Sequence, residues 1–157
     1  MQPITPFLWF DSQAEQAADF YVSVFPDSEI TGITRYGEAG PGVAGTAMVV
    51  AFTLRGMEFS ALNGGPVYQF TPAVSFVVDC QTQDEVDHYW DVLTADGGAE
   101  VQCGWLVDKF GVSWQIVPRR LTELMADPDG AKARRVTEAM LKMKKIIIAD
   151  LEAAARE

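Results

Sequence analysis

The sequence predicts an α+β fold in which two βαβββ modules form a cup-shaped, mainly antiparallel sheet. Three repeated features predict it: a strand-like run followed by a helical pattern, an aspartate and a tyrosine ten residues apart, and a closing hairpin arm that begins with glycine. The strand and helix patterns are Ile4–Phe10 with Ala14–Phe25 and Val74–Val78 with Glu85–Leu93, the spaced pairs are Asp11–Tyr21 and Asp79–Tyr89, and the arms are Gly56–Leu62 and Gly111–Val117.

The helices of the two modules are predicted from apolar residues at helical spacing. The first helix follows the cap-type or turn residues Asp11 to Gln13, and the second follows a turn at Asp79–Thr82. The apolar stripes are Ala17, Ala18, Tyr21 and Phe25 in the first helix and Val86, Tyr89, Trp90 and Leu93 in the second. Each module therefore begins with a strand and a helix that packs on its sheet.

The first module is predicted at about residues 4–63 and the second at about 73–118, with the link Gly64–Pro72 between them. A helical extension follows at about 121–156. Asp127 with Pro128 is typical of a helix start, because aspartate caps and proline favours the first turn.

The extension is predicted to hold one long helix and a short final one. Its apolar stripe comprises Val136, Ala139, Met140 and Met143. The β-branched run Ile146–Ile148 interrupts the pattern, and Asp150 is a candidate cap for the last helix. The stripe needs a partner surface, which supports a homodimer.

Composition excludes several classes of protein. The chain is 48% hydrophobic with a net charge of -10, so it predicts a packed core and disfavours nucleic-acid binding, because an acidic surface repels phosphate. No apolar run approaches the roughly 18 residues that cross a bilayer, so no membrane association is expected. With only Cys80 and Cys103, we expect free thiols and a cytoplasmic protein.

Four strings carry a resemblance to a known family: Phe7–Asp11, Ala61–Pro66, Ser75–Val78 and Cys103–Pro118. Together with the paired modules they resemble the demethylubiquinone methyltransferase-like (PhnB-like) branch of the vicinal oxygen chelate superfamily. That superfamily includes glyoxalase I, extradiol dioxygenases and bleomycin-resistance proteins. The resemblance covers nearly the whole chain and implies a single glyoxalase-like domain over residues 1–157.

The family name implies methyl transfer from S-adenosylmethionine, which is normally bound by a glycine-rich loop between a strand and a helix of a parallel sheet. Glycines do cluster between Gly37 and Gly45, but Glu38 and Pro41 interrupt them and a strand-like segment follows. This pattern favours a mobile hairpin loop. Closure of that loop over a ligand stays an open alternative. We therefore expect no cofactor, and the sequence disfavours methyl transfer.

The superfamily also implies a divalent metal held by histidines and glutamates at four strand positions. Carried over residue by residue, these positions hold Ile4 or Thr5, Ser60, Ala73 and Gln115. None is an imidazole or a carboxylate, so no metal site is expected. The single histidine, His88, lies within the second helix and is interpreted as a partly exposed helix residue rather than a ligand or base.

Without a metal, the predicted function depends on the faces of the strands that line the cup. Alternation along each strand predicts a lining that is aromatic and rich in hydroxyls, which suits a planar small molecule. The candidate ligand-binding residues are Trp9, Ser60, Ser75, Gln115, Phe7, Glu58 and Asn63. Two structural alternatives stay open: Phe7 and Trp9 simply fill the cup as core, and Asn63 serves only its turn.

Other polar residues are interpreted as structural. Cys103 lacks a convincing histidine or aspartate partner, and Asp108 with Lys109 is read as a solvated pair in a hairpin turn. Half of the basic residues lie in the C-terminal segment, which favours a cationic helix on an acidic body or partner over a nucleic-acid helix.

The sequence thus predicts a metal-independent protein that binds or sequesters an aromatic or quinone-like compound. The alternative is an enzyme acting on a small aromatic or quinone-type substrate, with catalytic residues unknown. An enzyme would have to rest on Glu58, the one carboxylate predicted to face inward.

Overall fold

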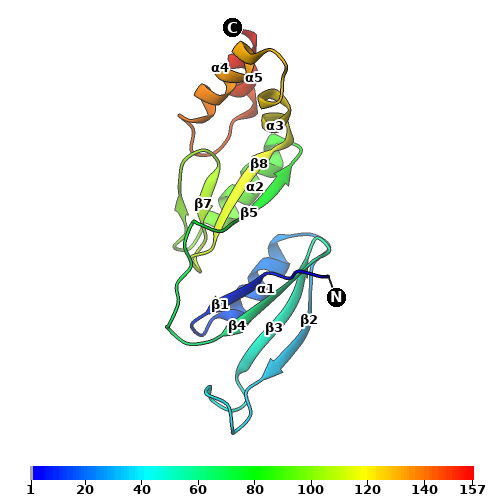
Figure 1. Cartoon of the computed structure of the whole chain (residues 1–157), viewed down its shortest axis with the longest axis vertical. Helices are drawn as coiled ribbons and strands as arrows, with labels where there is room; N and C mark the ends of the chain where they lie inside the picture. The colour runs from blue at the N-terminus through cyan, green and yellow to red at the C-terminus, as the bar shows by residue number, and fades with distance from the viewer. Residues whose placement is uncertain (1) are drawn as a thin grey trace. The chain divides into compact units, whose positions relative to one another are not determined.

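The structure is a computed structural model that describes residues 2–157 (Figure 1). Within these residues it holds, in chain order, β1 (Phe7–Phe10), α1 (Ala14–Val24), β2 (Glu29–Arg35), β3 (Ala47–Leu54), β4 (Met57–Asn63), β5 (Ser75–Cys80), α2 (Gln83–Thr94), β6 (Ala99–Glu100), β7 (Trp105–Val107), β8 (Ser113–Pro118), α3 (Arg119–Met125), α4 (Gly130–Met140) and α5 (Ile148–Arg156). No helix in this part of the chain is long and apolar enough to cross a membrane.

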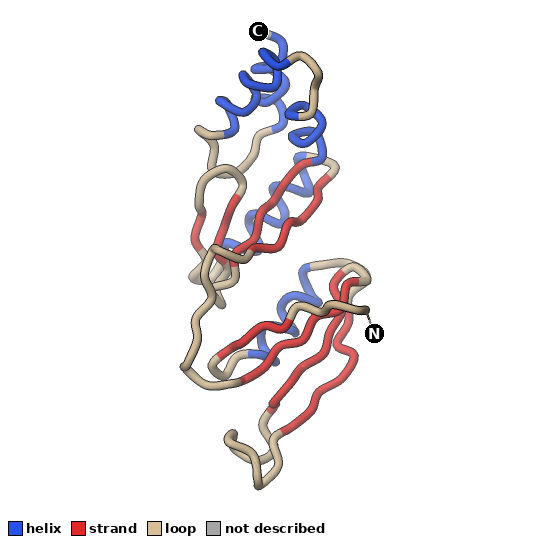
Figure 2. Tube along the Cα trace, viewed as in Figure 1, coloured by secondary structure: helices blue, strands red, loops and turns tan. Residues whose placement is uncertain are grey.

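The chain divides into two compact units at Phe70 and Thr71, inside the predicted link. Each unit contains one four-stranded mixed sheet with the same plan, in the order β1-β4-β3-β2 in the first and β5-β8-β7-β6 in the second (Figure 2). In each sheet the first strand pairs in parallel and the other two pairings are antiparallel. The predicted α+β fold of two βαβββ modules is therefore confirmed. That residues 1–157 form a single domain stays a prediction.

In the first unit, α1 covers one face of the sheet because alternate strand residues are apolar. Phe52 of β3 stacks on Phe59 of β4 with ring centroids 5.4 Å apart, and Tyr21 of α1 stacks on Phe52 at 6.4 Å. Ala17 and Ala18 are fully buried, and their small side chains let the helix approach the sheet closely. The opposite face of this sheet carries no helix of the first unit.

Helix α1 begins differently from the sequence expectation. Gln13 occupies the cap position but makes no side-chain bond to the helix. Instead, Oδ1 of Asn63 accepts the N–H of Ala14 at 2.8 Å, and its Nδ2 donates to the carbonyl of Ala47 at 3.1 Å. The cap comes from a distant residue because β1 and β4 pair in register and bring Asn63 opposite Phe10.

In the second unit, α2 begins at Gln83, two residues before the predicted start, and the side chain of Thr82 at the end of the predicted turn accepts the N–H of Glu85 at 3.2 Å. Its predicted apolar stripe is buried. The interpretation of Asp108 as a solvated residue is wrong, since it is 2% exposed. Its carboxylate accepts hydrogen bonds from the backbone of Phe110 and Val112 and from the indole of Trp114. A hairpin turn that folds back onto the core buries its own polar groups, and the carboxylate satisfies them.

The C-terminal helices begin at other residues than predicted. Asp129, not Asp127, caps α4 by accepting the N–H groups of Ala131 and Lys132, while Asp127 bonds the N–H of Asp129 and pairs with Lys132 at 2.8 Å. Asp150 is not a cap, because α5 already begins at Ile148. Helix α3, which follows β8 directly, was not expected as a separate helix.

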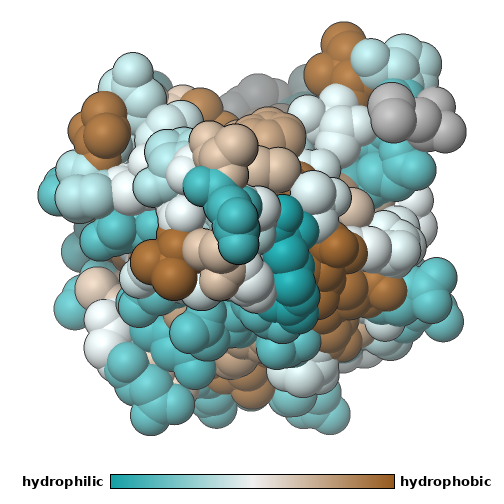
Figure 3. Space-filling view, turned by 90° about the horizontal axis from the view of Figure 1, so that it is seen from below, coloured by the Kyte–Doolittle hydropathy of each residue, from teal (hydrophilic) through white to brown (hydrophobic). Residues whose placement is uncertain are grey.

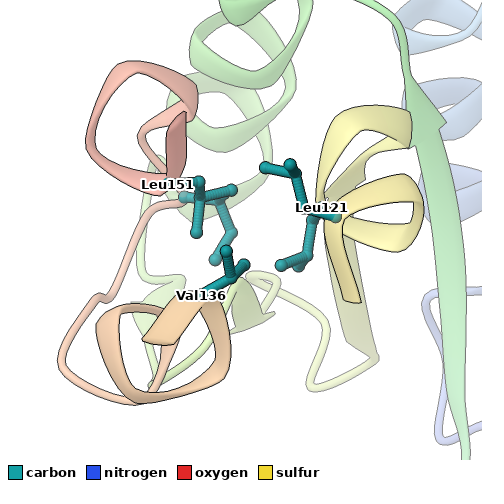
Figure 4. Close-up of a cluster of buried hydrophobic side chains, with 5 residues drawn as sticks. Leu121, Val136 and Leu151 are labelled. Carbon is teal, nitrogen blue, oxygen red and sulfur yellow. The ribbon is translucent and has the colours of Figure 1, made fainter. Parts of the chain in front are cut away.

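The apolar stripe of α4 is covered within the same chain. Val136 is fully buried in a cluster with Leu121 and Leu124 of α3 and Leu151 of α5, and Met140 and Met143 pack against it (Figure 4). The expectation that this stripe needs a partner subunit is therefore wrong. The physical reason is that Ile146 and Ile147 lie in the irregular segment between α4 and α5, which lets α5 fold back onto α4.

The extension is attached to α2 by polar contacts. The side chain of Gln83 donates to the carbonyl of Ile146 at 3.0 Å and accepts the N–H of Ile148 at 2.8 Å. Lys145 pairs with Asp87 at 2.8 Å, and its hydrogen bond, followed by that of Gln83, lowers the pKa of the Asp87 carboxyl. Part of the C-terminal positive charge is thus neutralised within the second unit.

Candidate functional site

A pocket of about 350 Å³ lies on the open face of the first sheet. Its floor is one row of residues across the strands, because Phe7 of β1 pairs with Ser60 of β4 and Ser60 pairs with Ala51 of β3. The small side chains of Ala51 and Ser60 leave the centre of the row hollow, and Phe7 forms one side with 57% of its surface exposed.

The row continues into β2 at an irregular position. Thr31 lies where the β2–β3 register shifts between Ile30 and Gly32, and it lines the pocket from there. The complete lining is Thr5, Phe7, Thr31, Ala51, Phe52, Glu58, Phe59 and Ser60. The pocket thus combines three hydroxyls, one carboxylate and aromatic rings.

Glu58 is held in place from the N-terminal segment. Its Oε2 accepts the backbone N–H of Gln2 at 2.7 Å, and its own N–H donates to the side-chain oxygen of Gln2 at 3.2 Å. The side-chain nitrogen of Gln2 in turn donates to the carbonyl of Glu58 at 3.0 Å. One hydrogen bond therefore holds the carboxylate beside the pocket, and two others tie the Glu58 backbone to the side chain of Gln2.

Two other predicted residues of the first unit have structural partners. Trp9 is half-buried; its indole donates to the carbonyl of Gly65 at 2.9 Å and its ring meets Tyr68 edge-on at 5.0 Å. A side chain at Gly64 would collide with the Trp9 ring, so that turn requires glycine. Neither Trp9 nor Asn63 lines the pocket on the open face. Asn63 lies instead in a separate pocket between the α1 start and the glycine-rich loop.

In the second unit, two predicted ligand residues contact each other. The side-chain nitrogen of Gln115 on β8 donates to the hydroxyl of Ser75 on β5 at 2.9 Å. The neighbouring Ser113 is buried, and its hydroxyl has no hydrogen-bond partner within residues 2–157. The structure therefore brings Phe7, Glu58 and Ser60 together in one unit and Ser75 with Gln115 in the other. Ligand contact by these residues stays a prediction.

The residues at the four strand positions where the superfamily holds a metal do not suit a metal ion. Thr5 and Ser60 present hydroxyls, Ala73 has no donor atom, and the amide of Gln115 is engaged with Ser75. Divalent transition metals in such folds require imidazoles and carboxylates. Within the described residues, no group of three histidine, cysteine, aspartate or glutamate side chains is placed to hold a metal ion.

The glycine-rich segment does not fit S-adenosylmethionine either. It connects the antiparallel strands β2 and β3, rather than a parallel strand and a helix. The buried ring of Tyr36 packs on this loop, and a side chain at Gly42 would lie 2.3 Å from it. These glycines therefore make room for Tyr36, whose hydroxyl donates to the carbonyl of Asn63.

His88 lies on α2, as the sequence predicted, and Cys103 lies in a turn before β7. His88 is exposed on α2 beside Tyr89, with ring centroids 5.2 Å apart. Cys103 has a positive φ of 59° in a turn, and its N–H donates to the carbonyl of Met143. Both Cys80 and Cys103 are free thiols.

Comparison with known proteins identifies the family. Residues 2–117 match the model of the 3-demethylubiquinone-9 3-methyltransferase family. The chain belongs to this family. A solved PhnB protein from Bacillus cereus is 42% identical over 74% of this chain and 99% of its own, with a TM-score of 0.69.

More distant structures share the fold with this member of the 3-demethylubiquinone-9 3-methyltransferase family. A protein from Pseudomonas aeruginosa is 17% identical over 75% of this chain and 98% of its own, with a TM-score of 0.61. The fosfomycin resistance protein FosX from Listeria monocytogenes is 13% identical over 75% and 93%, with a TM-score of 0.51. The resemblance to the vicinal oxygen chelate superfamily is confirmed. No curated protein matches the sequence.

The family match ends at residue 117, at the end of β8. Helices α3, α4 and α5 therefore lie outside the part of the chain that defines the family. The pocket on the first sheet lies entirely within it.

Sequence reasoning missed four residues of this pocket: Thr31, Ala51, Phe52 and Phe59. The alternation of β3 does place Ala51 on the open face, and its small size was the available signal. Thr31 gave no such signal, because a register shift within a strand pair is not visible in a single sequence.

Proposed function

We propose that the chain is a metal-independent small-molecule-binding protein that binds or sequesters an aromatic or quinone-like compound. The observation that carries the proposal is the pocket on the open face of the first sheet. In this pocket the ring of Phe7 lies next to Ser60, its partner on β4, and the floor consists of small residues. Its volume of about 350 Å³ is in the range of small-ligand sites. An aromatic ring would stack on Phe7 while hydroxyls bond its substituents.

A screen tests the proposal directly. Thermal shift against a panel of small aromatic and quinone compounds should find at least one that raises the melting temperature, and titration calorimetry should confirm saturable binding. A panel in which no compound binds would contradict the proposal.

A matched pair of variants locates the site. Ala51→Leu fills the floor of the pocket and should weaken binding at least 10-fold. Val49→Leu changes the preceding residue on the same face of β3, outside the pocket, and should bind like the parent. Equal binding by Ala51→Leu and the parent would place the ligand elsewhere.

An enzyme acting on the same compound is the second candidate, and Glu58 is the observation that favours it. Its carboxylate lines the pocket and is oriented by Gln2, so it is placed to accept a proton from a bound substrate. Incubating the bound compound with protein and following it by mass spectrometry separates the two functions. Turnover that is abolished in Glu58→Gln would establish the enzyme, and recovery of unchanged compound supports binding alone.

We also propose that the protein is a cytoplasmic homodimer. The free thiols Cys80 and Cys103 suit a reducing compartment. Exposed apolar residues on both sheets, among them Met57 and Val77, support an interface, and hydrophobic patches lie among hydrophilic ones in the space-filling view (Figure 3). Light scattering should give twice the mass of the chain, and a monomer at micromolar concentration would exclude the dimer.

A further inference from the structure

The pocket on the first sheet has a single charged group. Of its eight lining residues, Glu58 alone has an acidic side chain, and no lysine, arginine or histidine belongs to the lining. The three hydroxyls of Thr5, Thr31 and Ser60 can each donate or accept a hydrogen bond. The polar preference of the pocket is therefore decided by Glu58, because an ionised carboxylate only accepts.

One oxygen of this carboxylate is in use and the other is not. Oε2 accepts the backbone N–H of Gln2 at 2.7 Å. Oε1 has no hydrogen-bond or ion-pair partner in the part of the chain that the structure describes. Because Gln2 orients the group, the second oxygen is held ready for a donor without the entropy loss of ordering a free side chain.

The charge of Glu58 discriminates between forms of one aromatic ring. A ring hydroxyl or an ammonium group would give Oε1 a charge-assisted hydrogen bond, the stronger kind. A quinone carbonyl or a carboxylate at the same place would put two acceptors against each other with no proton between them. No basic residue of the lining compensates for that repulsion.

We infer that this pocket selects aromatic compounds that carry a hydrogen-bond donor, a phenolic hydroxyl or a protonated amine, over the quinone or carboxylate form of a similar ring. The inference rests on the proposed binding function and specifies its ligand class. It assigns to Glu58 the role of specificity determinant, with Gln2 as the residue that positions it.

Two ligand pairs test it by titration calorimetry without oxygen. Durohydroquinone and duroquinone share one carbon skeleton and differ in the two O–H groups, while benzylamine and benzoate place a cation or an anion on one ring. The parent protein should bind durohydroquinone at least 10-fold more tightly than duroquinone, and benzylamine more tightly than benzoate. The pair with the larger ratio shows whether hydroxyl or ammonium is the preferred donor.

Two variants make the test specific to Glu58. In Glu58→Gln the amide oxygen can still accept from Gln2 while the amide nitrogen becomes a donor toward the ligand, so the preference for durohydroquinone should vanish or reverse. Glu29→Gln removes an equal charge from exposed β2 of the same unit, outside the pocket, and should keep the preference.

The outcomes separate the inference from the function on which it rests. If no member of either pair binds, the inference is overturned, while the proposed function is decided separately by the wider panel of aromatic and quinone compounds. If both members of each pair bind equally, or the preference persists in Glu58→Gln, the pocket binds aromatic compounds but the inference is overturned.

Discussion

The carboxylate of Asp108 accepts the indole N–H of Trp114 at 2.8 Å, and both side chains are buried. The other carboxylate oxygen accepts the backbone N–H groups of Phe110 at 2.8 Å and Val112 at 3.0 Å. One side chain therefore closes the turn between β7 and β8 and fixes an aromatic ring in the core of the second unit.

We predict that Asp108→Ala is among the most destabilising substitutions in the second unit. It leaves three donors without their partner in a buried site, which should cost about 3 to 5 kcal/mol of unfolding free energy. Urea unfolding measures this. Asp91→Ala, which removes an exposed carboxylate from α2, should change the free energy by no more than about 0.5 kcal/mol. A loss below about 1 kcal/mol in Asp108→Ala would disprove the network.

Asn63→Ala should destabilise the first unit by about 1 to 2 kcal/mol, because α1 loses the acceptor for the N–H of Ala14 and the carbonyl of Ala47 loses a donor. Gln13→Ala is the matched control, since Gln13 occupies the cap position without a side-chain bond. Thermal unfolding of both variants checks the difference. Equal effects would mean that the remote cap contributes nothing.

Leu151→Ala should cost about 2 to 5 kcal/mol, because it opens a cavity in the buried cluster around Val136. Leu141→Ala makes the same chemical change at a side chain that is 58% exposed, and should cost far less. Chemical unfolding followed by circular dichroism compares them. Similar small losses would show that the three C-terminal helices do not pack as one cluster.

The pairing of Asp87 with Lys145 predicts a pH-dependent contribution to stability. Because Lys145 lowers the pKa of Asp87 in the folded protein, the unfolded chain takes up the proton first as the pH falls. The contribution is therefore full above the ordinary carboxyl pKa of 3.8 and is lost as the pH drops through the lower folded value.

Lys145→Met should reduce stability at pH 7 by about 0.5 kcal/mol, since both side chains are partly exposed to water, and should differ less from the parent below pH 3.8. Urea midpoints at the two pH values measure the change. Lys144→Met removes a neighbouring exposed charge and should show no such pH dependence. A deficit that grows at low pH would have the wrong sign for this pair.

Gln115→Ala should weaken ligand binding about 5- to 150-fold if its amide is a ligand contact, because a site built to use the amide keeps an unpaired group. Its stability should fall by less than about 1 kcal/mol, since Ser75, its partner at 2.9 Å, is half-exposed and can bond water instead. Gln102→Ala, at an exposed position, should affect neither quantity. Unchanged affinity in Gln115→Ala would remove this residue from the site.

Local patterns predicted much of the fold and part of the site. Alternation in the strands placed Phe7 and Ser60 on the open face and Phe59 under α1, because successive side chains of a strand point to opposite faces. The same pattern did not reveal that Trp9 would be held by Gly65 and Tyr68, since those contacts depend on how the link after β4 returns to the sheet.

Helix caps and the burial of charged side chains were predicted less well, because a polar side chain can bond several different backbone groups or side chains in the folded protein. The acceptor at the start of α2 is Thr82, which lies in the predicted turn directly before the helix. The acceptor at the start of α1 is Asn63 of β4, which is distant in sequence. The sequence predicts the turn that contains Asp108 correctly, but it predicts a solvated side chain where the structure has a buried one. An aspartate beside a lysine gives the same sequence pattern in both cases.

Periodic apolar residues and short strings are local properties of the chain, so the amino-acid sequence was enough to predict the two modules, their strand and helix pattern and the family. Two features needed the folded structure: the stripe of α4 is covered by α3 and α5, and the pocket on the first sheet runs from Phe7 through Ser60 and Ala51. Strand register and helix docking decide both, and they depend on contacts between residues distant in sequence, which no local pattern contains.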